Sequence, residues 1–222
     1  MNEQATEGQR AGDRLADISP ASATKPGAGL PALEGAMVGH EPARRAAVAV
    51  FGSASAPAGH AVLDEAERLG KMLAEAGLDL VCGGYAGVME AASRGACQAG
   101  GQVVGVTMDL FAPRLVPNRW LTREQRVTDF FPRLQALTAA DAFVVLRGGI
   151  GTLTEATLTW SLLQTGQISS RPFVLVGEDW RRLIDAFRAT TFITERDLGL
   201  ATVVDRVEEA VAFLRAELAP TP

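Results

Sequence analysis

Short runs of apolar residues alternate along this chain with segments in which apolar positions recur every three or four residues. The continuous runs are typical of strands buried on both faces of a parallel sheet, and they predict strands at residues 46–51, 78–82, 102–107, 142–146 and 172–177. The periodic segments predict helices at residues 60–77, 88–99, 132–139, 152–165, 180–189 and 206–218. This alternation predicts one doubly wound α/β domain, with a mainly parallel sheet and helices on both faces.

Two segments depart from the alternation. Residues 1–43 are rich in Ala, Gly, Pro and Glu and show no sustained period, so we expect a disordered or weakly ordered extension ahead of a domain at 44–222. A partner-binding arm is the alternative for this extension. Residues 108–131 are irregular and carry scattered prolines and arginines, which predicts a long loop with a short strand near 126–128. Loops of this length inside a compact domain are often functional.

Composition and charge favour a globular protein that binds neither long nucleic acid nor a membrane. The chain is 47% hydrophobic and 21% charged, as in globular proteins, and its net charge of −5 argues against binding to long nucleic acid. No apolar run reaches the ~20 residues that cross a bilayer, and no signal pattern opens the chain, so we expect no membrane association and a cytoplasmic location. Cys82 and Cys97 lack the spacing of a zinc site or a redox pair, and we interpret them as reduced packing residues.

Three of the predicted strands end in glycine-containing turns. These turns contain Gly52-Ser53, Gly83-Gly84 and Gly148-Gly149 with Gly151. Parallel strands place their carboxyl ends at one edge of the sheet, where ligands bind in folds of this class. Glycine lets the backbone approach a ligand closely, and the amides at the start of a following helix favour an anion. Together the turns predict a phosphate or nucleotide pocket.

The spacing of these glycines excludes two common nucleotide sites. Neither glycine run gives G-x-G-x-x-G, and the second strand ends at Cys82 where a dinucleotide fold would place an acidic residue. No G-x-x-x-x-G-K-[ST] sequence occurs. Hydride transfer and nucleoside triphosphate hydrolysis are therefore disfavoured.

One combination of motifs resembles a known family. It consists of Gly148-Gly149-Ile150-Gly151-Thr152 followed by Glu155, with Gly83-Gly84, Gly87-Val88-Met89 and Arg133 upstream. The chain over residues 46–187 is thereby similar to the LOG family of nucleoside 5'-monophosphate phosphoribohydrolases, whose members are often mislabelled lysine decarboxylases. The resemblance implies a Rossmann-like fold, a homodimer or larger assembly, and hydrolysis of a nucleoside monophosphate to free base and ribose 5-phosphate without metal or other cofactor. In cytokinin-activating members the base carries an isoprenoid group.

The resemblance also implies roles for individual residues. By this resemblance, Glu155 and Arg133 are the catalytic residues. Ser53 would contact the nucleotide, and Gly84 in the second glycine turn would lie beside the substrate. The expected phosphate-binding loop consists of Gly148, Gly149, Gly151 and Thr152. The chain departs from the family at three points: Arg147 stands where proline is expected, Leu134 stands where lysine commonly follows the arginine, and the interval from Arg133 to Asp141 is one residue shorter.

Simpler structural explanations compete with these roles. Thr152 and Glu155 fit a capping box at the start of a helix, and Arg133 could pair with Asp129 on the surface. Tyr85 could stack on a base or pack on the core. If the helix begins at Thr152, Glu155 lies in its first turn, where the helix dipole favours an ionised carboxylate. Such a group would activate water or oppose a cationic ribose rather than donate a proton.

Three functions remain open from the sequence. The leading hypothesis is release of the base from AMP or a cytokinin riboside monophosphate. The alternative is a non-catalytic nucleotide or cofactor carrier on the same scaffold, which the departures at Arg147 and around Arg133 favour. An amino-acid decarboxylase would need a lysine for pyridoxal phosphate, and the expected ordered region offers only Lys71, far along a helix from every glycine turn.

Overall fold

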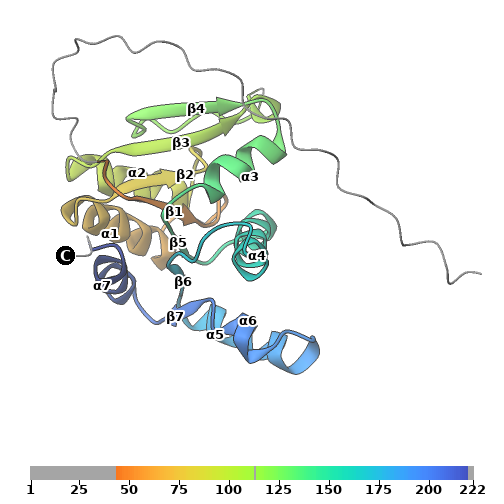
Figure 1. Cartoon of the computed structure of the whole chain (residues 1–222). Coiled ribbons are helices and arrows are strands. Elements are labelled where there is room, and N and C mark those ends of the chain that lie inside the picture. Colours follow the sequence, from red (N-terminus) through yellow and green to blue (C-terminus); the bar gives the residue numbers. More distant parts are fainter. Residues whose placement is uncertain (1–43, 113, 220–222) are drawn as a thin grey trace, which may run out of the picture. The chain divides into compact units, whose positions relative to one another are not determined.

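A seven-stranded sheet in which every neighbouring pair is parallel forms the centre of the computed structural model, which describes residues 44–112 and 114–219 (Figure 1). The strands are β1 (Ala47–Phe51), β2 (Asp79–Cys82), β3 (Val103–Met108), β4 (Arg123–Val127), β5 (Ala142–Val145), β6 (Phe173–Val176) and β7 (Thr202–Val204). This confirms the doubly wound α/β fold. The extension expected at residues 1–43 lies outside the described residues.

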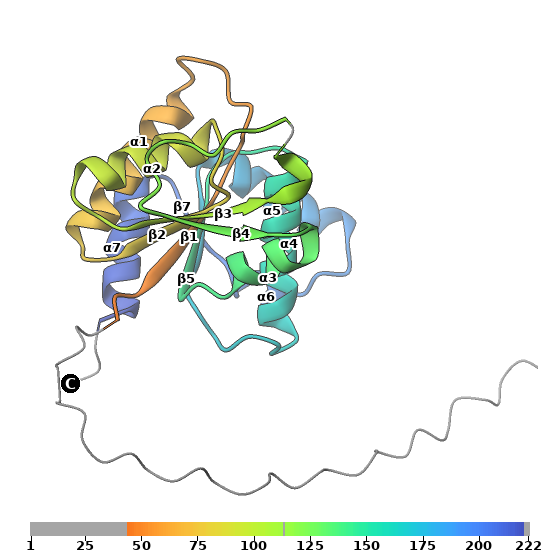
Figure 2. The ribbon, with the colours of Figure 1, turned by 90° about the horizontal axis from the view of Figure 1, so that it is seen from above.

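Seven α-helices and one 3-10 turn accompany the strands within the described residues, and all but α7 lie between two strands in the sequence. They are α1 (Ala61–Glu75), α2 (Val88–Gln98), η1 (Asp109–Phe111), α3 (Phe130–Thr138), α4 (Ile150–Gln164), α5 (Glu178–Thr190), α6 (Glu195–Leu198) and α7 (Val207–Glu217). Figures 1 and 2 show α1, α2 and α7 on one face of the sheet and α3 to α6 on the other. Each layer buries an apolar cluster against the sheet, because alternate strand side chains point to opposite faces.

The order of strands in the sheet is β4-β3-β2-β1-β5-β6-β7. The chain therefore builds outward from β1 to β4, returns to the other side of β1 with β5, and continues outward to β7. The direction reverses between β1 and β5, so the turns that follow these two strands open side by side. Such a reversal creates the crevice in which ligands bind in doubly wound folds.

The structure corrects several boundaries. A short strand was expected near residues 126–128, whereas β4 covers residues 123–127 and pairs with β3 along its length. The helix expected to start at Pro132 starts at Phe130, because Asp129 caps it by accepting a hydrogen bond from the Phe131 amide at 3.2 Å. The helix expected to start at Thr152 starts at Ile150.

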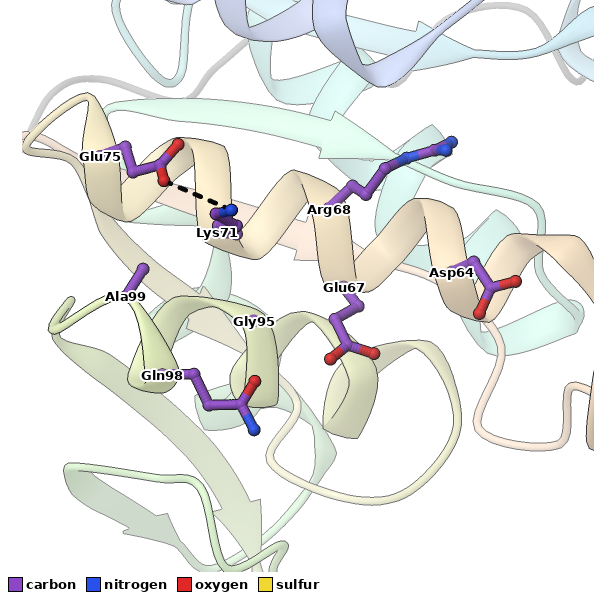
Figure 3. Close-up of a pocket in the computed structure, with 8 residues that line it drawn as sticks. All are labelled: Asp64, Glu67, Arg68, Lys71, Glu75, Gly95, Gln98 and Ala99. Carbon is purple, nitrogen blue, oxygen red and sulfur yellow. Dashed lines mark ion pairs between the residues drawn. The ribbon is translucent and has the colours of Figure 1, made fainter.

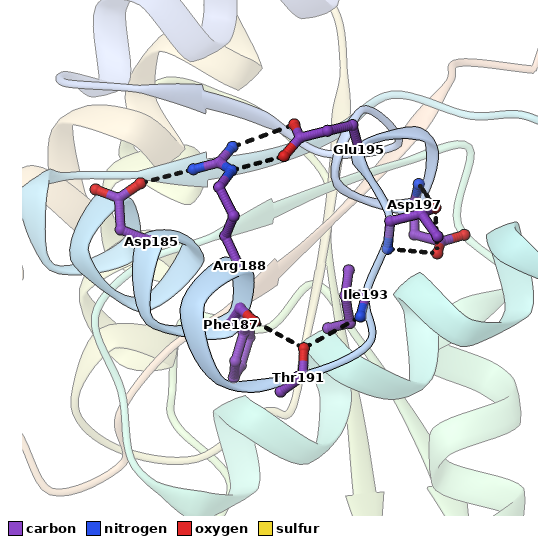
Figure 4. Close-up of polar contacts among 8 residues, drawn as sticks. Asp185, Phe187, Arg188, Thr191, Ile193, Glu195 and Asp197 are labelled. Carbon is purple, nitrogen blue, oxygen red and sulfur yellow. Dashed lines mark hydrogen bonds and ion pairs between the residues drawn. The ribbon is translucent and has the colours of Figure 1, made fainter.

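Two short elements near the carboxyl end were missed, namely α6 and β7. A capping box holds α6: the Thr194 hydroxyl accepts from the Asp197 amide, and the Asp197 carboxylate accepts from the Thr194 amide. Figure 4 shows the preceding turn, where the Arg188 guanidinium joins Asp185 on α5 to Glu195 on α6. One helical turn and three strand residues are too short to give a periodic pattern.

Candidate functional site

Backbone hydrogen bonds connect the turn after β1 to the turn after β5 and to the start of α2. After β1, the Ser53 amide donates to the Arg147 carbonyl at 3.4 Å and the Ser53 carbonyl accepts from the Val88 amide at 2.9 Å. A Cβ on Gly87 would lie 2.3 Å from the Ser53 carbonyl oxygen, and Gly87 has a φ of +68°. The turn after β1 therefore touches both the turn after β5 and the start of α2. The Ser53 hydroxyl accepts from the Ser55 amide at 3.0 Å.

Arg133 reaches this edge of the sheet from α3 and is almost completely buried, with 6% of its side chain exposed. Its Nη1 donates to the Gly83 carbonyl at 3.0 Å and to the Val106 carbonyl. Its Nη2 lies 3.7 Å from the Glu155 Oε1. The side chain thus pairs with Glu155 and not with Asp129, whose carboxylate caps α3.

Glu155 projects from α4 into the same buried space, with 15% of its side chain exposed. Burial raises the pKa of this carboxyl from 4.5 to about 7, and the charge on Arg133 opposes the rise. Both the protonated and the ionised forms are therefore populated near neutral pH. A carboxyl with this property next to a buried cation is typical of a catalytic site.

The structure contradicts one expectation about Glu155 and one of the competing explanations for it. Because α4 begins at Ile150, Glu155 is its sixth residue and lies outside the first turn, which contains no acidic side chain. The cap is Gly149, which makes no side-chain hydrogen bond, so Thr152 and Glu155 do not form a capping box. Burial, rather than the helix dipole, dominates the pKa of Glu155, and it favours the neutral form.

At the turn into α4, Gly148, Gly149 and Gly151 are exposed, whereas Thr152 is buried. A Cβ on Gly148 would lie 2.0 Å from the Thr152 hydroxyl oxygen, but a Cβ on Gly149 would meet nothing within 4 Å. The turn thus needs glycine at 148 for packing and leaves an open surface at 149. The adjacent Arg147 points to Asp179, 3.0 Å away, and both side chains are more than half exposed.

Sequence reasoning missed the part played by Gly83 and by Tyr85. A Cβ on Gly83 would lie 2.1 Å from Nη2 of Arg133, so this glycine makes room for the guanidinium. Tyr85 is 3% exposed, and the Arg133 Cζ lies 5.6 Å from its ring centroid. Of the two alternatives for Tyr85, packing in the core is the one observed. The Gly-Gly-Tyr sequence marked the turn, but only the fold brings Arg133 to it.

Other candidate groups lie elsewhere or make different contacts. Lys71 pairs with Glu75 at 3.7 Å in a groove between α1 and the carboxyl-terminal half of α2, away from the glycine turn before α2 (Figure 3). Arg94 pairs with Glu67 on α1 at 2.6 Å. Among the described residues, no three His, Cys, Asp or Glu side chains gather in a way that could hold a metal ion. Within the same residues, no helix is long and apolar enough to cross a membrane.

The chain is similar to a family of known proteins. A family model described as "Possible lysine decarboxylase" matches residues 89–214. Cytokinin riboside 5'-monophosphate phosphoribohydrolases of Rhodococcoides fascians and Mycobacterium tuberculosis are 34% and 31% identical; the matches cover 68% and 74% of this chain and 80% and 90% of those proteins. The rice enzyme LOG is 36% identical over 52% of this chain, and the match spans only 48% of the rice protein.

Two solved structures of molybdenum cofactor proteins are also similar to this chain. The molybdenum cofactor carrier protein of Chlamydomonas reinhardtii superposes with a TM-score of 0.63 and 26% identity, over 79% of this chain and 99% of that one. The molybdenum cofactor binding protein of Rippkaea orientalis superposes with a TM-score of 0.62 at 21% identity, over 79% of this chain and 98% of that one, and this likeness shows the fold alone. Enzymes and carriers are thus both built on this scaffold.

Proposed function

Because this chain belongs to the LOG family, whose model is described as "Possible lysine decarboxylase", we propose that it hydrolyses the N-glycosidic bond of a nucleoside 5'-monophosphate. The products are free base and ribose 5-phosphate. The substrate class is AMP or a cytokinin riboside monophosphate, by analogy with the names of the similar enzymes. The observation that carries the proposal is the buried Arg133 and Glu155 pair at the glycine-lined edge of the sheet.

The chemistry of base release fits this pair. The bond between the ribose C1' and the base nitrogen breaks with its electrons going to the base, which leaves a cation on the ribose. Water then adds to C1', and the proton it loses balances the proton that the departing base gains. In our proposal the negative charge of ionised Glu155 stabilises the ribose cation, and the same carboxylate accepts the proton from water. Arg133 is the cation that favours this ionised form.

The substrate phosphate has a natural place in this arrangement. We assign it to the turn formed by Gly148, Gly149, Gly151 and Thr152, at the amino end of α4, where free amides and the helix dipole favour an anion. The exposed face of Gly149 leaves room for close approach. Glu155 follows Thr152 by three residues, which is about one helical turn. The phosphate at Thr152 and the reacting C1' at Glu155 would therefore be about one turn of α4 apart. Ser53 and Gly84 would complete the walls of the pocket.

The deciding experiment is a hydrolysis assay with AMP and isopentenyladenosine monophosphate, following free base by chromatography. We expect release of base by the wild type and a loss of at least about a hundredfold in Glu155→Gln, which keeps the side chain's size and removes its charge. Glu75→Gln, which removes an exposed carboxylate on α1, is the matched control and should keep full activity. Equal rates in the wild type and Glu155→Gln would refute the proposal.

A carrier function is the second candidate, and the superposition on the Chlamydomonas carrier favours it. In that case the same crevice would bind a phosphorylated ligand without breaking it. Calorimetry with AMP and with the molybdenum cofactor separates the two functions. Tight binding with no base released over hours selects the carrier, whereas turnover of the nucleotide selects the hydrolase.

We further propose that the chain acts as a homodimer. Exposed apolar side chains cluster at the starts of α3 and α4, where Phe131 is 79% and Ile150 is 81% exposed. Helix α4 has no charged side chain except Glu155, so its outer face, on which Thr157, Ser161 and Gln164 are exposed, is uncharged. Sedimentation should give a dimer for the wild type and a monomer for the Phe131→Ser and Ile150→Ser double variant. A monomeric wild type would contradict this assembly.

A further inference from the structure

Tyr85 is a buried polar side chain that the proposed reaction does not use. It follows the Gly83-Gly84 turn, and its hydroxyl lies at the end of β3, where it accepts a hydrogen bond from the Met108 amide at 2.8 Å. The same hydroxyl is 3.4 Å from the Met108 carbonyl, to which it can donate. The ring is therefore fixed at both ends, by the turn after β2 and by the end of β3.

The ring of Tyr85 lies against the guanidinium of Arg133. The distance of 5.6 Å from Arg133 Cζ to the ring centroid is within the ~6 Å over which an aromatic face attracts a cation. Both side chains are nearly inaccessible to water, at 3% for the Tyr85 residue and 6% for the Arg133 side chain. In such surroundings the attraction is stronger than on a surface.

The contacts of Arg133 come from a small set of groups. The Gly83 and Val106 carbonyls accept from Nη1, and the Tyr85 ring lies near Cζ. Nη2 faces Glu155 at 3.7 Å. A guanidinium on a long side chain can rotate about several bonds, so two carbonyls on one nitrogen leave its plane free to tilt. The Tyr85 ring near Cζ, together with the Gly83 backbone beside Nη2, limits this tilt.

We propose that Tyr85 is a positioning residue, which holds the Arg133 guanidinium at its working distance from Glu155. This inference rests on the proposed function for its catalytic meaning, although the positioning itself is a property of the folded chain. Tyr85 cannot also stack on a base in this conformation, because its ring is buried and meets Phe111 edge-on at 5.8 Å.

A displaced guanidinium would change the titration of Glu155. Arg133 from α3 is the charged group that opposes the effect of burial on this carboxyl. Cys82 from β2 also lies close enough to interact, but burial raises the pKa of its thiol and keeps it neutral. Moving Arg133 away therefore leaves burial unopposed and raises the pKa of Glu155 further.

The test compares three variants of the full chain. Tyr85→Leu removes the aromatic face, Tyr85→Phe keeps the face and removes the hydroxyl, and Phe111→Leu removes the neighbouring ring that does not face Arg133. We expect the acid limb of the kcat/KM profile of Tyr85→Leu to shift to higher pH by about half a unit or more, with kcat/KM at pH 7 about twofold lower or more. In Tyr85→Phe and Phe111→Leu the acid limb should lie at the same pH as in the wild type. A wild-type limb in Tyr85→Leu would overturn the proposal.

A direct titration makes the result independent of turnover. Carbon NMR of labelled glutamate, with the Glu155 signal assigned by its loss in Glu155→Gln, reports the pKa of this carboxyl even if the protein hydrolyses no nucleotide. A higher pKa in Tyr85→Leu but not in Tyr85→Phe supports the positioning role in either case. Tyr85→Met serves as a second non-aromatic variant if Tyr85→Leu does not fold, and an unchanged pKa in the folded non-aromatic variant refutes the role.

Discussion

The guanidinium of Arg133 lies 3.7 Å from the carboxylate of Glu155, although the two side chains come from different helices and are 22 positions apart in sequence. The distance is longer than a direct hydrogen bond, so the pair is an electrostatic contact in a space largely closed to water. Burial and the cation act on Glu155 in opposite directions, and burial has the larger effect. A carboxyl held near its midpoint at neutral pH follows from this balance.

Activity should therefore depend on pH through Glu155. We expect kcat/KM for AMP to rise with pH and to reach a plateau above an apparent pKa of about 7, because the ionised carboxylate is the active form. The profile would be recorded between pH 5 and 9 at constant ionic strength. A profile that falls with increasing pH through this range would mean that the protonated form acts, as a donor to the departing base.

The same carboxyl should lower the stability of the ligand-free protein at alkaline pH. Its pKa is higher in the folded chain than in the unfolded one, so the folded state binds more protons and loses stability as pH rises from 4.5 through 7. A shift of this size corresponds to about 3 kcal/mol as an upper value. Glu155→Gln should thus raise the free energy of unfolding at pH 8 and leave it nearly unchanged at pH 4. Denaturant melts at the two pH values measure this, and equal effects at both would contradict it.

The turn before α4 offers a matched pair of glycine variants. Gly148→Ala places a Cβ against Thr152 and should destabilise the fold by about 1 to 3 kcal/mol while weakening nucleotide binding. Gly149→Ala meets nothing within 4 Å, so its stability should stay within about 0.5 kcal/mol of the wild type. Any rise in the Kd of Gly149→Ala for AMP then reports contact with the ligand alone. Unchanged binding in both variants would place the phosphate elsewhere.

Arg147 should matter little, even though it replaces the proline expected at this position. Its partner Asp179 is 3.0 Å away on the surface, and exposed ion pairs contribute about 1 kcal/mol or less. Arg147→Ala should keep kcat and KM within about twofold and barely change the melting temperature. Thermal melts and initial rates at two salt concentrations check this. A tenfold rise in KM would show that the arginine itself binds the substrate phosphate.

Much of the fold was predictable because its signals are local. Continuous apolar runs such as residues 46–51 can be stable only in a sheet covered on both faces, and the glycines that follow them mark the ends of strands. The same locality explains the failures. Helix α4 starts two residues earlier than expected because backbone geometry at Gly149 ends the turn, whereas the Thr152 and Glu155 pattern suggested a side-chain cap.

The sequence by itself determined which residues carry the candidate chemistry: the glycines at the strand ends, Glu155 and Arg133, together with the resemblance that connects them. The tertiary structure decided how far these side chains are buried and which groups contact them. It buried Glu155, brought Arg133 beside it, and opened the space at Gly83 that the guanidinium fills. Burial and charge at such a site depend on groups from β2, β3, α3 and α4 together, including the Gly83 and Val106 carbonyls, and no local pattern in one segment specifies a distance to another.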